Sequence, residues 1–129
     1  MDAYIASVGE RSITYRVHAF VDDAQRRAET LIALAKRFEL RHDAIIDVLN
    51  GDIILRVSDL DALALGAKIE MFDDALHDEE PTATVIAGKH PNRANLKVWG
   101  ELPATIERMR ALKKAFDPKG ILNPGRFLV

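Results

Sequence analysis

The order of the predicted elements indicates an α+β fold of the ferredoxin-like (split βαβ) type, with an antiparallel sheet and helices on one face, plus a C-terminal helix and a stiff tail. Three observations predict the sheet and its helices. Residues 12–21 alternate apolar and polar side chains, as a half-buried strand does. Residues 44–57 contain two β-branched runs around Asn50-Gly51, which is a strong hairpin signal. Segments with apolar residues every three or four positions follow both, as helices do.

The first strand is expected to lead into a helix that ends near Glu39. Asp22 stands immediately before it and has a side chain that is favoured at an N-cap. Charged residues occupy the other faces of this helix. Its predicted buried stripe comprises Ala24, Ala28, Leu31, Ile32, Ala35 and Phe38.

The hairpin is expected to turn through Asn50-Gly51 as a two-residue type I′ turn, which needs positive φ at both positions. Ser58 is then expected to cap a second helix, with Asp61 in the place of the capping-box acid. Acidic residues crowd the carboxyl end of that helix, so we expect it to fray near Asp78. Its predicted buried stripe comprises Leu60, Leu63, Ala64, Ala67, Met71 and Leu76.

The rest of the core is expected to be short and irregular. Residues 82–88 predict a last strand, residues 89–95 a polar loop, and residues 96–99 a short extended run. The second face of such a sheet is open unless something covers it. Either the terminal helix or a partner could do so.

The last stretch, from Trp99 to Val129, predicts a turn, a helix and a stiff tail. Pro103 suits the first turn of a helix, and Asp117-Pro118 ends it. Residues 117–120 and 123–126 then have the Pro and Gly positions of type I and type II turns. The helix stripe comprises Leu102, Ile106, Met109, Leu112 and Phe116, and the tail adds Ile121, Leu122, Phe127 and Leu128. We expect a pre-shaped segment that lies against something.

Residues 109–127 resemble the carboxyl end of FAD-linked oxidases of the vanillyl-alcohol-oxidase type, and within them the FAD-binding subunit of glycolate oxidase. That subunit ends in a helix with L-K and then D-P-x-G-[IVL]-[LF]-N-P-G-R, and Trp99-Gly100 also fits its pattern. The resemblance implies the C-terminal, substrate or cap domain of an FAD-dependent oxidoreductase. The implied reaction is oxidation of a small 2-hydroxy acid, with the hydride accepted by FAD.

In that family a separate domain makes most of the contacts with FAD. The seven glycines here are scattered, and none has the G-x-G-x-x-G spacing of a pyrophosphate-binding loop. We therefore expect residues 1–129 to form a single domain without the FAD-binding domain, to need an FAD-binding domain or subunit as partner, and to be inactive alone. Its expected parts are a lead-in over 1–11, a ferredoxin-like core over 12–99, and the helix and tail over 100–129.

Asn123 and Arg126 are the candidate cofactor-binding residues. The resemblance implies that they lie close to the flavin, where an amide can bond the ring edge and a guanidinium can hold a carboxylate or phosphate. From the residues alone, Asn123 merely starts a turn and Arg126 is solvated.

Lys89, His90, Arg93 and Lys97 form a basic cluster that could receive a substrate carboxylate. The alternative is a solvated loop that offsets the acidic end of the second helix. Trp99 could stack on a ligand, although a lone Trp is more often a core anchor.

Composition argues against several classes. Eighteen basic and twenty acidic residues give a net charge of −2, unlike most nucleic-acid binders. Cysteine is absent, which suits a cytoplasmic protein, and no apolar run approaches the ~20 residues of a membrane span. No metal site is expected, since the histidines are far apart in the chain: His18, His42, His77 and His90. The alternative function is a free-standing, non-catalytic module that forms a homodimer or pairs with another subunit.

Overall fold

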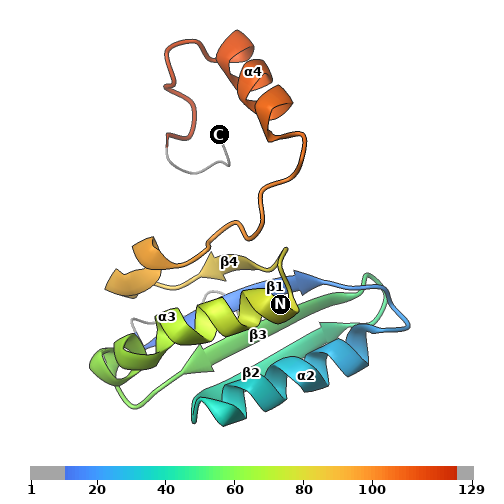
Figure 1. The fold of residues 1–129 in the computed structure, drawn as a ribbon, viewed down its shortest axis with the longest axis vertical. Helices are drawn as coiled ribbons and strands as arrows, with labels where there is room; N and C mark the ends of the chain where they lie inside the picture. The colour runs from blue at the N-terminus through green and yellow to red at the C-terminus, as the bar shows by residue number, and fades with distance from the viewer. Residues whose placement is uncertain (1–10, 125–129) are drawn as a thin grey trace.

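The computed structural model describes residues 11–124. An antiparallel sheet in the order β2-β3-β1-β4 forms its core, and two helices lie on one face of it (Figure 1). The strands are β1 Ser12–His18, β2 Arg41–Asp47, β3 Asp52–Ser58 and β4 Thr84–Ala87. The two helices are α2 Ala24–Arg37 and α3 Ala62–Glu79. The ferredoxin-like prediction is confirmed.

The hydrophobic core lies between the sheet and these helices. Alternate residues of β1 point into it, and the side chains of Ile13, Tyr15 and Val17 are fully buried. Residues of β3 continue the same layer because they pair with β1 across the sheet. Phe72 of α3 makes edge-on contacts with Tyr15 and Phe38, at centroid distances of 5.8 and 5.6 Å. One ring of α3 therefore links the sheet to the end of α2.

The predicted end of the first strand is wrong. β1 stops at His18 because its partner β3 begins at Asp52, directly opposite. The chain then turns, and Phe20 is 82% exposed. The N-cap position of α2 is Asp23 rather than Asp22, and its carboxylate binds Arg26 instead of capping the helix.

Most of the predicted stripe of α2 is buried. Leu34 joins it, whereas Ile32 is only half-buried. Phe38 follows the helix at its C-cap and packs partly against the core.

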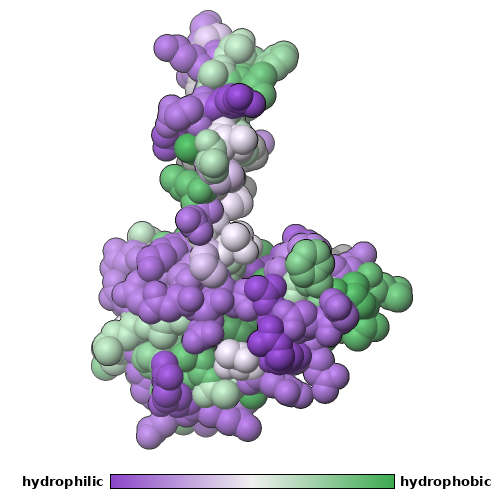
Figure 2. Space-filling model, turned by 45° about the vertical axis from the view of Figure 1, so that its right-hand side comes forward, coloured by the Kyte–Doolittle hydropathy of each residue, from purple (hydrophilic) through white to green (hydrophobic). Residues whose placement is uncertain are grey.

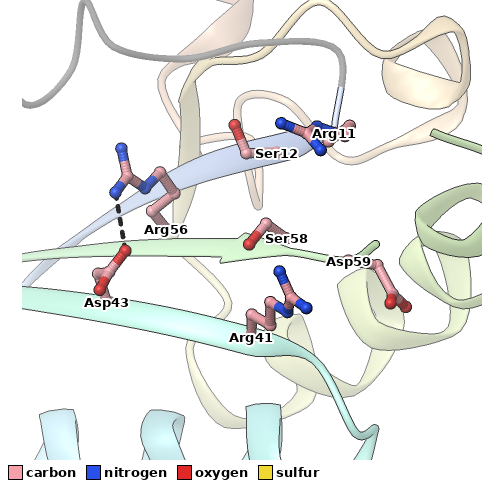
Figure 3. Close-up of a pocket in the computed structure, with 7 residues that line it drawn as sticks. All are labelled: Arg11, Ser12, Arg41, Asp43, Arg56, Ser58 and Asp59. Atoms are coloured by element: carbon pink, nitrogen blue, oxygen red, sulfur yellow. Dashed lines mark hydrogen bonds and ion pairs between the residues drawn. The ribbon is translucent and has the colours of Figure 1, made fainter. Parts of the chain in front are cut away.

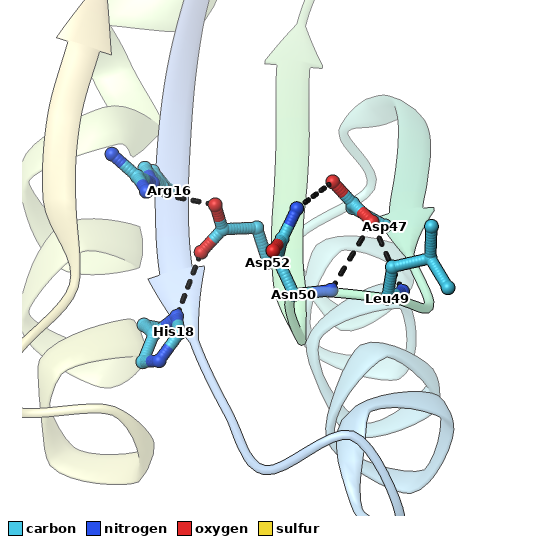
Figure 4. A network of polar contacts seen from close by, with 6 residues as sticks. All are labelled: Arg16, His18, Asp47, Leu49, Asn50 and Asp52. Atoms are coloured by element: carbon cyan, nitrogen blue, oxygen red, sulfur yellow. Dashed lines mark hydrogen bonds and ion pairs between the residues drawn. The ribbon is translucent and has the colours of Figure 1, made fainter.

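The predicted hairpin is present, but its two-residue turn is wrong. Asp47 pairs with Asp52, so the loop has four residues, and among residues 48–51 only Gly51 has positive φ. The Asp47 carboxylate accepts bonds from the backbone of Leu49 and from the backbone and amide of Asn50 (Figure 4). Asp47 thus fixes a longer loop as an Asx-type turn.

The predicted cap and buried stripe of the second helix are wrong. Ser58 stays in β3, and Asp61 is the N-cap, accepting a bond from the Ala64 backbone N–H at 2.8 Å. The helix runs to Glu79 and buries Leu65, Ile69, Phe72, Asp73, Leu76 and His77. Only Leu76 of the predicted stripe is among them, because the helix turns a different face, with Leu65, Ile69 and Phe72, toward the core. Leu63 and Met71 are consequently exposed.

The last part of the core is compact. β4 is shorter than predicted, and the predicted loop contains a 3₁₀ helix, η1 Pro91–Asn95. The extended run after it lies along β4, where the Val85 backbone N–H donates to the Val98 carbonyl oxygen at 2.8 Å. No helix among residues 11–124 is long and apolar enough to cross a membrane.

The terminal helix, α4 Ile106–Phe116, stands away from the sheet (Figure 1). None of its residues is buried, and Phe116 is 83% exposed. The helix therefore does not cover the open face of the sheet. Figure 2 shows apolar surface on this projecting part of the molecule, mixed with hydrophilic side chains.

Candidate functional site

A cavity of about 920 Å³ lies beside β4, on the edge of the sheet. One wall is β4 itself, and the others are η1 and the run that ends at Trp99. His90, Arg93 and Trp99 line it, so the fold brings together three of the four residues predicted to bind substrate. Lys89, the fourth, is exposed and is not among the lining residues.

His90 is buried and holds η1 against α3. Its Nε2 donates to the Ala62 carbonyl oxygen at 2.6 Å, and its Nδ1 accepts from the Asn92 backbone N–H at 3.1 Å. Asn92 in turn donates from its side chain to the Gly66 carbonyl oxygen. Both ring nitrogens of His90 are thus engaged within the protein, and the residue positions the wall of the cavity.

The predicted basic cluster is divided by the fold. Arg93 lies at the cavity and donates to the Gly88 carbonyl oxygen at 3.4 Å. Lys97 instead pairs with Asp74 of α3 at 3.1 Å, and this hydrogen bond raises the pKa of Lys97. Arg93 is therefore the cation of the cluster that faces the cavity.

Trp99 is 42% exposed, so it is not a fully buried core anchor. Gly100 follows it with φ of +66°, and a side chain there would collide with the backbone carbonyls of Pro81 and Ala83. This close approach directs the chain away from the sheet toward α4.

A buried polar network at α3 was not predicted from the sequence. The Asp73 carboxylate accepts from the Tyr15 hydroxyl at 3.0 Å and from the Lys97 backbone N–H at 2.9 Å. The His77 ring lies between two backbone carbonyl oxygens, with Nδ1 2.8 Å from that of Asp73 and Nε2 3.0 Å from that of Ala83. The i,i+4 spacing of Asp73 and His77 was the available signal.

This network contains too few ligand side chains for a metal centre. Within residues 11–124, no group of three or more histidines and acidic residues could hold a metal ion. We interpret the network as structural, because it connects the sheet, α3 and the start of the run toward Trp99.

The tail after α4 is fixed by two side chains at the end of that helix. The Asp117 carboxylate accepts from the backbone N–H groups of Ile121 and Leu122, both at 3.0 Å. Lys113 donates to Asp117 at 2.6 Å and to the Leu122 carbonyl oxygen at 2.7 Å. Chiefly through the Lys113 hydrogen bond, these contacts lower the pKa of Asp117 to about 2. We call Lys113 and Asp117 the tail clasp.

Beyond the tail clasp the chain remains exposed. The predicted turn at 117–120 is present, since the Gly120 backbone N–H donates to the Asp117 carbonyl oxygen at 3.0 Å. Asn123 is exposed and has φ of +47°, a left-handed conformation that asparagine tolerates. Arg126 lies outside the described residues. Figure 1 shows the segment after α4 standing away from the sheet, and among residues 11–124 none after Trp99 lines the cavity beside β4. The described part of the tail and this cavity therefore do not form one site.

Comparison with known families identifies this same stretch. Residues 99–127 match the model of the family described as FAD linked oxidases, C-terminal domain. The match begins at Trp99 and covers α4, the tail clasp and both predicted turns. It leaves the whole sheet outside. No curated protein matches the sequence.

The matched residues fit a peripheral contact with FAD better than an enclosing site. Asn123 offers an exposed amide that can donate to and accept from the edge of a flavin ring. The best-formed cavities among residues 11–124 lie against the sheet, α2, α3 and η1, and none of these is lined by residues 106–124. The described part of the tail could thus contribute a contact to a flavin site.

Proposed function

We propose that this chain is the C-terminal part of an FAD-dependent oxidoreductase that oxidises a small 2-hydroxy acid, resembling the flavin subunit of glycolate oxidase. The observation that carries the proposal is the tail itself. Its shape is fixed by the tail clasp, yet two of its apolar side chains are mostly exposed: Ile121 is 71% exposed and Leu122 is 59% exposed. Such a segment is preorganised for contact with another surface.

The proposed partner is a flavin-binding domain or subunit. The family match falls on the segment that is both pre-shaped and unburied, and α4 adds exposed Leu112 and Phe116 beside it. Contact with a partner would remove this apolar area from water, which favours association. In that complex FAD would supply the redox chemistry, since it accepts the hydride that the substrate loses.

This chain would contribute binding and orientation. Asn123 is proposed to hydrogen-bond the flavin edge, and Arg126 to hold a carboxylate or phosphate. At the cavity beside β4, Arg93 is proposed to bind the substrate carboxylate and Trp99 to stack on the substrate, with His90 fixing the wall. Lys89, next to His90 in the chain, is the fourth proposed substrate contact. Hydride transfer then requires that the partner bring this cavity and Asn123 to the same flavin. Such a protein would be cytoplasmic.

The direct test is a titration of the isolated chain with FAD, followed by absorbance and flavin fluorescence. We expect no stoichiometric complex at micromolar concentration and no oxidation of glycolate or lactate, because the main cofactor surface belongs to the partner. A one-to-one flavin complex formed by the chain alone would refute the proposal that the partner provides most of the FAD-binding surface.

A second candidate function is a free-standing module that self-associates. The same exposed residues favour it, because a contiguous apolar surface commonly marks an interface. Light scattering from micromolar to millimolar concentration separates the candidates. A monomer at every concentration would eliminate self-association, whereas a dimer that Phe116→Glu dissociates would support it.

A further inference from the structure

A second hollow, of about 340 Å³, lies on the open face of the sheet, at the end where β1 begins and β3 ends. Its lining comprises Arg11, Ser12, Arg41, Asp43, Arg56, Ser58 and Asp59. Figure 3 shows the three arginines around the two serines. We call it the arginine hollow. It belongs neither to the cavity beside β4 nor to the stretch that matches the oxidase family.

The strand register builds this hollow from rigid elements. Arg41 of β2 pairs with Ser58 of β3, and Ser58 pairs with Ser12 of β1, so the three form one row across the sheet. In the next row of the same face, Asp43 pairs with Arg56. Residues two apart on a strand point to the same side, so both rows face the hollow.

The carboxylates of the hollow already have cationic partners. Asp43 binds Arg56 at 2.7 Å, and Asp59 binds Lys68 at 2.9 Å. The hydrogen bond from Lys68 and the Leu60 backbone N–H lower the pKa of Asp59, so it stays ionised.

The other two arginines of the hollow, Arg11 and Arg41, have no carboxylate partner among residues 11–124. Arg11 donates to a neutral acceptor, the Leu60 carbonyl oxygen, at 3.4 Å. Within residues 11–124, Arg41 makes no ion pair within 4.0 Å, and the charge of Arg41 is the smallest of the causes that lower the pKa of Asp59. Counted over residues 11–124, the lining of the hollow is therefore positive on balance, and it contains the hydroxyl donors of Ser12 and Ser58.

We propose that the arginine hollow binds the oxyanion group, phosphate or carboxylate, of a small molecule. Guanidinium groups offer planar pairs of N–H donors that match the oxygens of either group. Arg41 and Arg11 supply the charge, while Ser12 and Ser58 add neutral donors between them. The volume lies at the lower end of the range for small-molecule sites, which suits a compact anion. The site needs no flavin and no partner.

The test is a calorimetric and NMR titration of the full chain with inorganic phosphate and, separately, with acetate, at constant ionic strength set by chloride. We expect saturable binding of one anion per chain, with shifts of the Ser12 and Ser58 amide signals. Saturation by phosphate alone assigns a phosphorylated ligand, and saturation by acetate alone assigns a carboxylate. Non-saturating shifts with both anions would overturn the proposal.

Three variants sharpen this test. Arg41→Gln should weaken binding roughly tenfold, as expected for the loss of a charge-assisted bond. Asp43→Asn should strengthen it, because it removes a negative charge from the lining of the hollow. Arg108→Gln, an exposed arginine of α4, is the matched control and should change nothing. Equal losses in Arg41→Gln and Arg108→Gln would mean general charge attraction and would contradict a built site.

Discussion

The Tyr15 hydroxyl donates to the Asp73 carboxylate at 3.0 Å, inside the core between β1 and α3. Both side chains are almost completely buried, at 0% and 2% exposure. This bond joins the central strand to the helix that carries the wall of the cavity beside β4. It also places Asp73 where its second oxygen receives the Lys97 backbone N–H.

Tyr15→Phe should therefore destabilise the protein without changing its fold. The variant leaves a buried carboxylate with one donor fewer, at a cost of about 1–3 kcal/mol in the free energy of unfolding. Urea unfolding followed by circular dichroism measures this. Thr14→Val is the matched control: the Thr14 hydroxyl is buried and has no hydrogen-bond partner within the described residues, so its loss should cost less than about 0.5 kcal/mol. Equal effects of the two variants would contradict the role of the bond.

Tyr15 should also make the free energy of unfolding fall at alkaline pH. Burial, the Asp73 charge and the hydrogen bond raise the pKa of Tyr15 well above its ordinary value of 10.0. For a group whose folded pKa is raised, the stability it contributes is complete below the unfolded pKa and is lost as the pH rises toward the folded pKa. We expect the free energy of unfolding to fall above pH 10 in the parent protein and to fall less in Tyr15→Phe. Parallel declines in both proteins would argue against this linkage.

Gly51 is predicted to be irreplaceable in the hairpin loop. Its φ is +77°, and a Cβ there would collide with the Ala19 carbonyl oxygen. Gly51→Ala should lower the free energy of unfolding by about 2 kcal/mol or more, since the left-handed conformation alone costs about 1–2 kcal/mol. Gly120→Ala is the control. Gly120 has a similar φ of +62°, but a Cβ there would meet open space. It follows α4, none of whose residues is buried, so the free energy of global unfolding should not change.

The tail clasp should open at acid pH. Asp117 has its pKa lowered to about 2 from an ordinary value of 3.8, so its contribution is complete above about pH 4 and is lost as the pH falls toward 2. Amide hydrogen exchange at Ile121 and Leu122 reports this directly. We expect protection at pH 5 that declines below pH 4, and none at either pH in Asp117→Ala.

Neighbouring lysines of α4 provide a matched pair for the same measurement. Lys113→Met removes the bonds to the Asp117 carboxylate and to the Leu122 carbonyl oxygen, and should expose the Ile121 and Leu122 amides. Lys114→Met changes an exposed lysine and should leave them protected. Identical protection in the two lysine variants would show that the tail is held by other contacts.

Local patterns predicted the sheet because they act within a few residues. The alternation in β1 and the glycine of the hairpin loop determine strand and turn, and the order of elements then allows few topologies. The phase of α3 was not predictable in this way. Ser58 has the side chain of a cap, yet its pairing with Arg41 and Ser12 keeps it in the sheet, and the helix starts three residues later. Tertiary packing, such as that of Phe72 against Tyr15 and Phe38, sets which face of α3 is buried.

The candidate site was predicted in part. His90, Arg93 and Trp99 meet at one cavity because the chain folds back along β4, as their closeness in sequence suggested. The bond between Tyr15 and Asp73 joins residues far apart in the chain, and so do the contacts of the arginine hollow. The spacing of apolar residues predicted the apolar face of α4. That spacing does not indicate whether the surface that covers this face belongs to the same chain or to another one.

We propose above all that residues 99–127 contribute to the flavin site of an FAD-dependent oxidoreductase. The most direct measurement is a chimera, in which these residues replace the matching tail of a characterised FAD-linked oxidase. The readout is the ratio of bound FAD to protein by absorbance. We predict close to one FAD per chain, a lower ratio in the chimera with Asn123→Ala, and no change with Lys119→Ala, an exposed residue of the first turn. A folded chimera that binds no FAD, or one in which Asn123→Ala has no effect on flavin occupancy or affinity, would contradict the claim.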